Sequence, residues 1–328
     1  MKIEISEYEK KYSFNLEKIT QLCGQNVMKK TYIFESIRRY FSTYKYREEQ
    51  NKWRENIKVD GEAVGRKFFE ILSVSSMEDV LMTIKWSKQS LMMDYVKQLT
   101  QRFEWQTHMR VINEELEKMF QMMNLEINHL GKLELVFAMS NVWDILQKSE
   151  VVGIEQKILE EQDNYELLMI FMNLIEEVLK CNPRKMLVLI ENLDHLVTRE
   201  EYMCVLNKLN EITRKFDVYF VLSTSIDGYV KYDKELCSGI KIFGDVDFQM
   251  PEFDKIAEFI NERYPYHKVL ADEQIFNDLR MVTQKIGQSD FLYSVEESVV
   301  CKMVNKTLML YDKWEKEEKA LEIAFLKS

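Results

Sequence analysis

A lysine pair followed by a threonine, four residues after a glycine, has the spacing of a phosphate-binding loop. Residues 19–31 read ITQLCGQNVMKKT, whereas a working loop reads G-x-x-x-x-G-K-[ST]. Gly24, Lys30 and Thr31 are in register, but Lys29 replaces the second glycine. Glycine lets backbone amides approach a phosphate closely, and a long side chain disfavours that conformation. The sequence therefore predicts the outline of a nucleotide site with an impaired phosphate grip.

A second half-motif, MLVLIENLD, occupies residues 186–194. The apolar run Met186–Ile190 is typical of a strand buried on both faces of a parallel sheet. Glu191 follows it, where a P-loop enzyme places the carboxylate that binds the water shell of its metal. Asn192 stands where many such ATPases carry a catalytic glutamate, and an amide cannot act as a general base. Each half-motif lacks a critical residue, which predicts that the chain is not an enzyme.

Other patterns predict the elements that would position these half-motifs. Alternating residues at 2–5 and 12–16 predict a hairpin, and residues 19–23 predict a third strand. Apolar residues at helical spacing predict a helix from Thr31 to Tyr46, and residues 68–74 predict a short strand. Further strands are predicted at 218–222, which ends in Ser223-Thr224-Ser225, and at 240–248, with a helix at 199–215.

This order of elements predicts an α/β fold: a P-loop-NTPase-like head with a mainly parallel sheet and an N-terminal hairpin, plus a helical leg domain. The discontinuous head comprises residues 1–76 and 165–250, with a helix at 165–179. The leg is the insertion 77–164, helical to residue 146 with a break at Gly131, and it ends in an acidic linker at 150–164. Residues 251–328 are predicted to form a C-terminal helical extension, with its last helix ending near Trp314.

The net charge of −10 conceals an asymmetry along the chain. Residues 1–110 hold 20 basic and 15 acidic residues, whereas the remainder holds 25 basic and 40 acidic residues. Residues 18–58 contain ten basic residues and four acidic residues. Such a basic field favours a polyanion partner at one face, although a solvated helix surface explains the composition equally well. The candidate DNA contacts are Lys29, Lys30, Arg38, Arg39, Lys45, Arg47, Lys52 and Arg54.

Cysteine usage and hydropathy predict a cytoplasmic protein. The five cysteines are scattered and form no CxxC pair, which favours reduced thiols, and the four histidines lie far apart, which argues against a structural zinc site. The charged N-terminal residues do not read as a signal peptide, and no run of about 18 apolar residues predicts a membrane span.

Four stretches together resemble the long form of the type II-A CRISPR-associated Csn-two family. They are ITQLCGQNVMKKTYIFESIRRYF, KMLVLIENLDHL, FDVYFVLSTSIDGYV and IFGDVDFQMPEFDK, and the resemblance covers nearly the whole chain. It implies an α/β head related to P-loop ATPases, a helical leg, and a homotetrameric ring that binds double-stranded DNA ends through a basic central hole. It also implies a role in acquiring new spacers, beside the integrase pair and the RNA-guided effector nuclease.

The resemblance implies no required cofactor. Short members of the family bind calcium, but the resemblance assigns no metal ligands to residues of this sequence. The leading hypothesis is a non-enzymatic ring that binds DNA without sequence preference and with steep salt dependence. One alternative is an active P-loop NTPase, in which Lys30, Thr31 and Glu191 bind phosphate, Mg²⁺ and the metal's water shell, and Asp194 replaces the missing base. The other alternative is a protein–protein adaptor that does not bind DNA.

Overall fold

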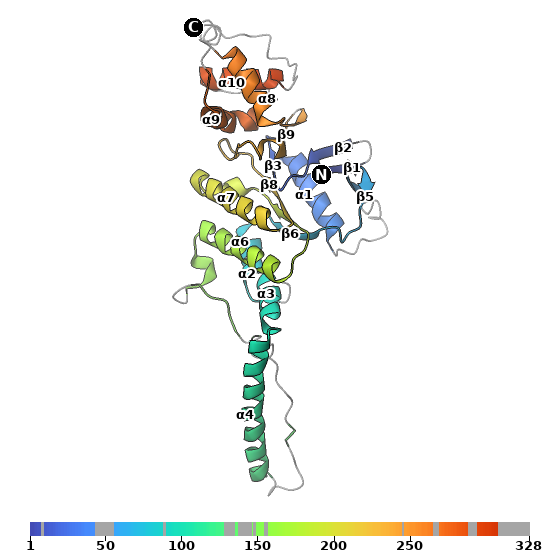
Figure 1. Cartoon of the computed structure of the whole chain (residues 1–328), viewed down its shortest axis with the longest axis vertical. Helices are drawn as coiled ribbons and strands as arrows, with labels where there is room; N and C mark the ends of the chain where they lie inside the picture. Colours follow the sequence, from blue (N-terminus) through green and yellow to red (C-terminus); the bar gives the residue numbers. More distant parts are fainter. Residues whose placement is uncertain are drawn as a thin grey trace. The chain divides into compact units, whose positions relative to one another are not determined.

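A computed structural model describes residues 1–7, 10–42, 56–87, 90–127, 135–136, 146, 149–153, 157–244, 246–264, 269–287 and 294–307. The chain divides into two compact units (Figure 1). The first unit combines residues Met1–Asp79 with Arg184–Ser328, and the second comprises Val80–Pro183. Both sheets and both half-motifs lie in the first unit. Among the described residues, no helix is long and apolar enough to cross a membrane.

The predicted N-terminal hairpin is confirmed, and it belongs to a larger antiparallel sheet. Strand β1 (Lys2–Glu7) pairs with β2 (Lys10–Asn15) and, on its other side, with β4 (Ile57–Val59). Strand β5 (Glu62–Ala63) completes the order β2-β1-β4-β5. Neither β4 nor β5 is predicted from the sequence, because strands of three and two residues are too short to show an alternating pattern.

The six-stranded sheet has the order β10-β9-β3-β8-β7-β6. Four of its five pairings are parallel, and only β10 and β9 are antiparallel. Its strands are β3 (Ile19–Cys23), β6 (Glu70–Val74), β7 (Met186–Ile190), β8 (Val218–Ser223), β9 (Ile240–Phe243) and β10 (Asp247–Gln249). Every residue of β7 is buried, as the continuous apolar run predicts.

The prediction of one strand over residues 240–248 is wrong. The chain turns after Phe243, so that Asp247 pairs with Phe243 and Phe248 pairs with Ile242 in an antiparallel hairpin. Ile240, Ile242 and Phe248 all join one buried core. Apolar residues therefore recur on both arms of the hairpin, and this pattern resembles that of a single strand.

Helix α1 (Val27–Phe41) lies in the core between the two sheets of the first unit. Its buried residues Ile33, Phe34 and Ile37 pack in one cluster with residues of both sheets, among them Ile3 of β1 and Leu189 of β7. Helix α7 (Arg199–Lys215) covers the opposite face of the six-stranded sheet (Figure 1). It begins at a capping box made by Thr198 and Glu201, which satisfies backbone amides of its first turn.

The C-terminal helices predicted after Pro251 are confirmed within the described residues. They are α8 (Phe253–Arg263), α9 (Asp272–Val282) and α10 (Val295–Thr307), with a 3₁₀ turn at Thr283–Lys285. Their apolar side chains share a core with β9 and with Cys23 of β3. This core brings residues near 284 to the end of β3. The helix end expected near Trp314 lies outside the described residues.

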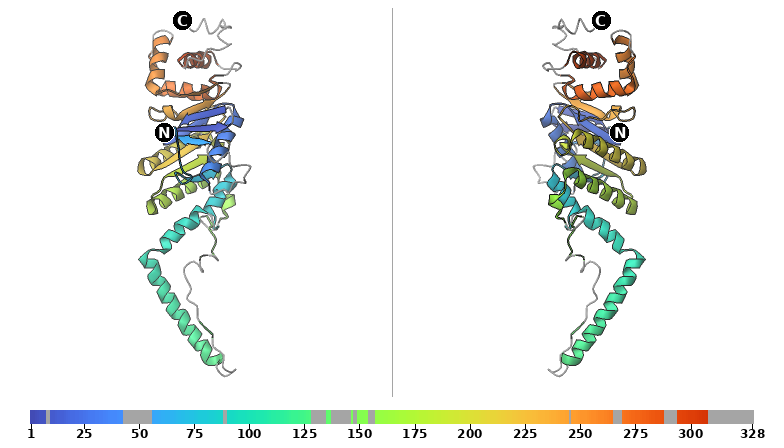
Figure 2. Two further views of the ribbon diagram at one scale, coloured as in Figure 1. Left: turned by 90° about the vertical axis from the view of Figure 1, so that its right-hand side faces the viewer. Right: turned by 90° about the vertical axis from the view of Figure 1, so that its left-hand side faces the viewer.

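Helices make up the regular structure of the second unit. Helix α2 (Met77–Ile84) leads into it, followed by α3 (Leu91–Thr100), α4 (Phe103–Ile127), a 3₁₀ turn (Leu159–Glu161) and α6 (Asn164–Cys181). The chain bends between α3 and α4 (Figure 2). Helix α6 confirms the helix predicted at 165–179. The break expected at Gly131 lies outside the described residues.

Candidate functional site

The carboxyl ends of three adjacent parallel strands bring the two half-motifs to one edge of the sheet. Strand β8 lies between β3 and β7, so the loop after Cys23 and the segment after Ile190 flank Ser223. Two hydrogen bonds join these ends: Thr224 N donates to the carbonyl of Leu22 at 3.1 Å, and Asn192 N donates to Ser223 Oγ at 2.9 Å. Open α/β sheets bind ligands at such an edge.

Helix α1 begins at Val27, four residues before the predicted start at Thr31. The side chain of Asn26 caps the helix by accepting a hydrogen bond from Lys29 N at 3.1 Å. A working phosphate loop keeps its backbone amides in a wide turn around the phosphate. Here three of the loop residues are already in the first helical turn, so the turn between Gly24 and the helix is short.

Gly24 adopts a left-handed conformation with φ of 92°. A Cβ at this position would collide with the carbonyl oxygen of Phe243. The same carbonyl accepts a hydrogen bond from Asn26 N at 3.0 Å. Only glycine combines this φ with this close approach, so Gly24 is a true requirement of the loop.

The Lys30 side chain is turned inward and is 2% exposed. Its Nζ donates to the carbonyl of Gly24 at 2.7 Å, the carbonyl of Thr224 at 2.6 Å and Ser225 Oγ at 2.6 Å. Burial lowers the pKa of Lys30 below its usual value of 10.5, and the neighbouring Cys23 and Asp194 oppose this shift. An ammonium has three protons to donate, so Lys30 has no donor left for a phosphate oxygen in this conformation.

Gln284, in the C-terminal segment, forms a further contact with the loop. Its side chain is fully buried, and its Oε1 accepts a hydrogen bond from Gly24 N at 2.6 Å. Its Nε2 donates to Thr224 Oγ1 at 3.0 Å. No local sequence pattern indicates this role, because Gln284 lies 260 positions from Gly24 along the chain.

Lys29, which replaces the second glycine, points to the β9–β10 hairpin. Its Nζ forms an ion pair with Asp247 at 2.7 Å and donates to the carbonyl of Gly244 at 3.2 Å. Both charged side chains are 25% exposed. Thr31, the predicted magnesium ligand, is exposed on α1. The structure therefore separates Lys29, Lys30 and Thr31 into three different environments.

Polar groups of the second half-motif also form hydrogen bonds within the chain. Asn192 has a left-handed backbone with φ of 53° and begins a 3₁₀ turn that contains Asp194. The Asp194 carboxylate is 4% exposed, and its Oδ2 accepts from Ser225 N at 2.6 Å and Ile226 N at 2.8 Å. Asp194 thus anchors the backbone that follows β8.

Glu191 lies half-buried at the end of β7, as predicted. Burial raises the pKa of Glu191 above 4.5. The charge of Arg38 opposes this shift, and the charge of Asp79 adds to it. Within the part of the chain that is described, no three Asp, Glu, His or Cys side chains are grouped so that they could hold a metal ion.

The last turn of α1 presents the predicted arginines. Arg38 and Arg39 both pair with Glu35, and their side chains are 40% and 45% exposed. Arg66 joins them, because its Nε donates to the carbonyl of Tyr40 at 3.2 Å and its Nη2 to that of Arg39 at 3.5 Å. We call these three arginines the α1-end cluster. Four further candidates lie outside the described residues: Lys45, Arg47, Lys52 and Arg54.

The outer face of the four-stranded sheet forms a second basic surface. The strand registers place Lys2, Lys11 and Lys58 on this face together with Glu4, and at its edge the carboxylate of Asp60 accepts from Lys2 N at 2.6 Å. Lys2 forms an ion pair with Glu4 at 2.7 Å, and this contact, with the charges of Lys58 and Lys11, lowers the pKa of Glu4 below 4.5. Sequence reasoning missed Lys2 and Lys11, because only the strand pairing brings them beside Lys58.

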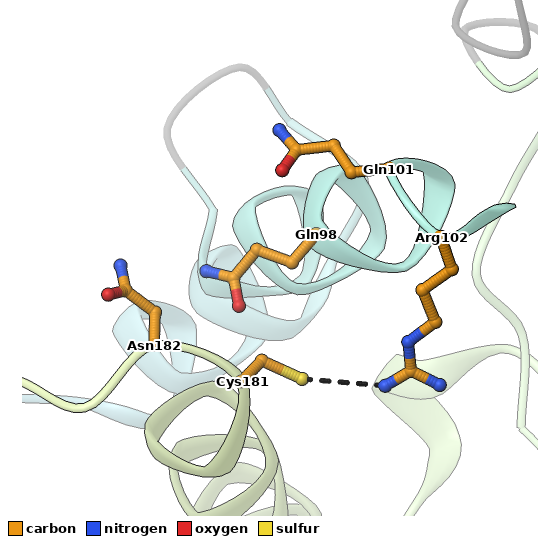
Figure 3. Close-up of a pocket in the computed structure, with 5 residues that line it drawn as sticks. All are labelled: Gln98, Gln101, Arg102, Cys181 and Asn182. Carbon is orange, nitrogen blue, oxygen red and sulfur yellow. Dashed lines mark hydrogen bonds between the residues drawn. The ribbon is translucent and has the colours of Figure 1, made fainter.

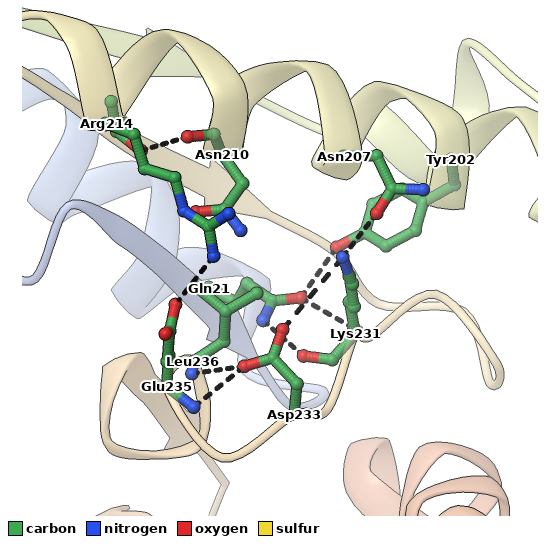
Figure 4. A network of polar contacts seen from close by, with 10 residues as sticks. Gln21, Tyr202, Asn207, Asn210, Arg214, Lys231, Asp233, Glu235 and Leu236 are labelled. Atoms are coloured by element: carbon green, nitrogen blue, oxygen red, sulfur yellow. Dashed lines mark hydrogen bonds and ion pairs between the residues drawn. The ribbon is translucent and has the colours of Figure 1, made fainter.

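A buried glutamine holds the connection between β8 and β9 (Figure 4). Gln21 Oε1 accepts from Tyr202 OH at 2.9 Å and from Lys231 N at 2.8 Å, and its Nε2 donates to the carbonyl of Lys231 at 2.8 Å. Lys231 Nζ in turn donates to Asn207 Oδ1 at 2.5 Å. Every contact is internal, which indicates that this network is a structural support.

The second unit contains a separate polar pocket of about 480 Å³. Figure 3 shows the side chains that line it: Gln98, Gln101, Arg102, Cys181 and Asn182. Arg102 Nη2 lies 3.8 Å from Cys181 Sγ. None of the residues predicted to bind DNA or nucleotide lines this pocket.

Comparison with solved structures supports the fold. The structure of Stu0660 of Streptococcus thermophilus matches with a TM-score of 0.86 and 23% identity, covering 100% of both chains. An Smc head bound to the C-winged helix domain of ScpA matches with a TM-score of 0.42 and 14% identity, covering 76% of this chain and 94% of that chain. The ADP-bound ABC-transporter cassette MJ1267 scores 0.39 at 9% identity, covering 88% and 98%. The latter two matches are too weak to support a conclusion.

Sequence comparison identifies the family. A search of curated proteins found no match. The family model described as CRISPR-associated protein Csn2 subfamily St matches residues 5–313, which is nearly the whole chain. This agrees with the resemblance drawn from the four sequence stretches. The chain belongs to the CRISPR-associated Csn2 family, subfamily St.

Proposed function

We propose that this chain binds double-stranded DNA without sequence preference, as a subunit of a homotetrameric ring that supports the acquisition of new spacers. Membership in the Csn2 family carries this proposal, because the resemblance implies a ring that binds DNA ends beside the integrase pair and the effector nuclease. Four copies around one hole multiply a local basic surface fourfold. A net charge of −10 per chain is therefore compatible with DNA binding.

Two surfaces of the first unit support DNA binding. The α1-end cluster presents guanidinium groups, which bind phosphate oxygens in bidentate geometry. The outer face of the four-stranded sheet presents Lys2, Lys11 and Lys58 beside Glu4, and lysines are common phosphate contacts. The described residues of these surfaces offer charged groups that suit phosphate oxygens, so we propose contacts to the DNA backbone.

We further propose that the chain does not hydrolyse nucleotides. The contacts of Lys30 and Gln284 within the loop, together with the amide of Asn192 in place of a carboxylate, support this part of the proposal. An active NTPase would need Lys30 to leave three oxygen partners. Calcium remains an expectation from the family resemblance. The described residues hold no fitting ligand group, so we propose no calcium-dependent step.

The decisive experiment is size-exclusion chromatography with light scattering, with and without a blunt duplex. We expect a tetramer that co-elutes with the duplex and a binding constant that falls steeply between 50 and 200 mM salt, by a factor of roughly 10³ or more for six or more phosphate contacts. A covalently closed circle of the same sequence tests the requirement for ends. A tetramer that never binds the duplex would favour the adaptor alternative, and a monomer would reject the ring.

A nucleotide turnover assay tests the remaining alternative, an active P-loop NTPase. Phosphate release is measured with ATP or GTP, Mg²⁺ and duplex, for the natural chain and for Lys30→Ala. We expect the same background rate for both proteins. Turnover that disappears in Lys30→Ala would establish an active P-loop NTPase and contradict the non-enzymatic part of the proposal.

A further inference from the structure

The contact between Gln284 and Gly24 has the geometry of a ligand in a phosphate loop. In a working loop, oxygens of the phosphate accept hydrogen bonds from backbone amides of the loop and of the helix start that follows it. Here the oxygen that accepts from Gly24 N, at 2.6 Å, belongs to the Gln284 amide. This side chain is fully buried and comes from the C-terminal segment of the same unit.

We propose that the loop keeps a binding site for one oxygen of an oxyanion, and that Gln284 fills this site as an internal ligand. The chain would then use its own C-terminal segment for the structural role that a bound phosphate has in a working loop. This inference concerns the loop alone and is independent of DNA binding. The chemical class that the vacated site would accept is a tetrahedral oxyanion, either free phosphate or sulfate or the phosphate group of a nucleotide.

The surroundings of the contact provide a positive charge and a hydroxyl donor. The Lys30 ammonium lies 2.7 Å from the carbonyl of Gly24, the residue whose amide donates to Gln284. The three oxygens that Lys30 contacts belong to two neutral carbonyls and a hydroxyl, and none of them is an anion. Thr224 Oγ1, which accepts from Gln284, carries a hydroxyl proton that can be donated to an oxyanion instead.

The geometry also explains why the site takes a single oxygen. The close approach of Gly24 to Phe243 and the early start of α1 remove the wide turn that would surround a whole phosphate. The buried carboxylate of Asp194 also restricts which ligand fits, because it lies near enough to influence Lys30 and would repel a second negative charge. The amide oxygen of Gln284 is small enough for the short turn and carries no negative charge.

The test is thermal unfolding of Gln284→Ala in sodium phosphate, in sodium sulfate and in sodium chloride at matched ionic strength. In chloride we expect Tm to fall by roughly 2–10 °C, because Gly24 N loses its acceptor in a buried site. Phosphate and sulfate should restore part of this loss. Both anions also stabilise folded proteins in general, so the recovery is compared with a control.

Thr283→Val is the matched control. Thr283 is equally buried and adjacent in sequence, but its hydroxyl bonds to Tyr232 OH at 2.7 Å and to the backbone, away from the loop. We expect Thr283→Val to lose stability without a specific recovery in phosphate. Equal recovery of the two variants would overturn the proposal. An ADP arm identifies the source: recovery at ADP concentrations where phosphate alone is ineffective assigns the oxyanion to a nucleotide.

A second pair of variants keeps the test decisive if Gln284→Ala does not fold. Gln284→Glu retains an acceptor oxygen and adds the charge of an oxyanion, whereas Gln284→Leu has a similar size and no acceptor. At pH 8 we expect Gln284→Glu to unfold at a higher temperature than Gln284→Leu. The reverse order would show that the site rejects an anionic oxygen, and the proposal would then be wrong.

Discussion

Helix α1 carries lysines at its start and arginines at its end, and the two ends meet different surroundings. At the start, Lys30 is buried among three oxygens and Lys29 is paired with Asp247. At the end, Arg38 and Arg39 lie near the surface and both pair with Glu35. Their guanidinium groups are partly exposed to a partner, whereas the ammonium groups at the start are held by internal oxygens and by Asp247.

A count of basic residues therefore overestimates the charge that a partner can reach. A buried ammonium stabilises the fold that surrounds it, and its long-range field is weakened by nearby acceptors and carboxylates. Exposed guanidinium groups contribute little to stability but add to the field that attracts a polyanion. The loop of α1 is therefore expected to matter for folding, and the α1-end cluster for binding.

Replacing Lys30 by methionine should have the largest effect and would test the loop side of this comparison. The variant leaves three buried oxygens without their donor, so we expect a loss of about 2–5 kcal/mol in the free energy of unfolding. Urea unfolding monitored by circular dichroism measures this loss. A loss below that of Lys29→Met would show that the buried ammonium does not stabilise the loop.

Charge reversal of the α1-end cluster tests the other side. For Arg38→Glu/Arg39→Glu we expect duplex affinity to fall roughly 10- to 100-fold, and the slope of log K against log salt to flatten by about 2 units. Fluorescence anisotropy with a labelled blunt duplex measures both quantities. The free energy of unfolding should change by about 1 kcal/mol or less.

Arg110→Glu/Lys118→Glu is the matched control for this reversal. These residues of α4 pair with Glu114 at i,i+4 and Glu115 at i,i+3, which reproduces the spacing of the Arg39 and Arg38 pairs. We expect the control to lose less affinity than the α1-end variant. Equal losses would mean that net charge, and not the position of these arginines, controls DNA binding.

Cys23 links the loop to the pH dependence of stability. Burial raises the pKa of its thiol from 9.0 to about 12, so between these values the folded state keeps a proton that the unfolded state has lost. Its contribution to stability therefore decreases as pH rises above 9, by about 1.4 kcal/mol per pH unit. Lys30 works in the opposite direction, because its folded pKa is lowered.

The comparison of the natural chain with Cys23→Ala isolates this contribution. Measured by urea unfolding at pH 8.5, 9.5 and 10.5, the natural chain should lose stability relative to the variant at each step. Parallel pH profiles for the two proteins would show that the thiol is not held in its protonated form by burial.

Replacing Lys29 by methionine should have the smallest effect. Its ion pair with Asp247 is partly exposed and screened, so we expect a stability loss of about 1 kcal/mol or less. Because this pair already neutralises Lys29, the salt slope of DNA binding should stay unchanged. A flattened slope would place Lys29 among the DNA contacts and would remove the proposed distinction between the two ends of α1.

Local patterns allowed much of the α/β unit to be predicted. The buried run at 186–190, the strand at 19–23 and the helix at 199–215 follow from apolar spacing, and the structure confirms them. The start of α1 was misplaced, because apolar spacing locates the buried face of a helix and the cap at Asn26 determines where it begins. The prediction for residues 240–248 is wrong, because apolar residues on both arms read as one strand, and the turn signal of Gly244 and Asp245 between the arms is missed.

The family resemblance, the central strands and helices of the α/β unit, and the two departures from a nucleotide-binding motif, Lys29 and Asn192, follow from the sequence alone. What these departures mean depends on the tertiary structure. Side-chain periodicity reports burial within one element, and it carries no information on which distant residue fills a given hydrogen-bonding position. For that reason the partners of the loop, Gln284 and Asp247, become visible only when the C-terminal segment and the β9–β10 hairpin pack against it.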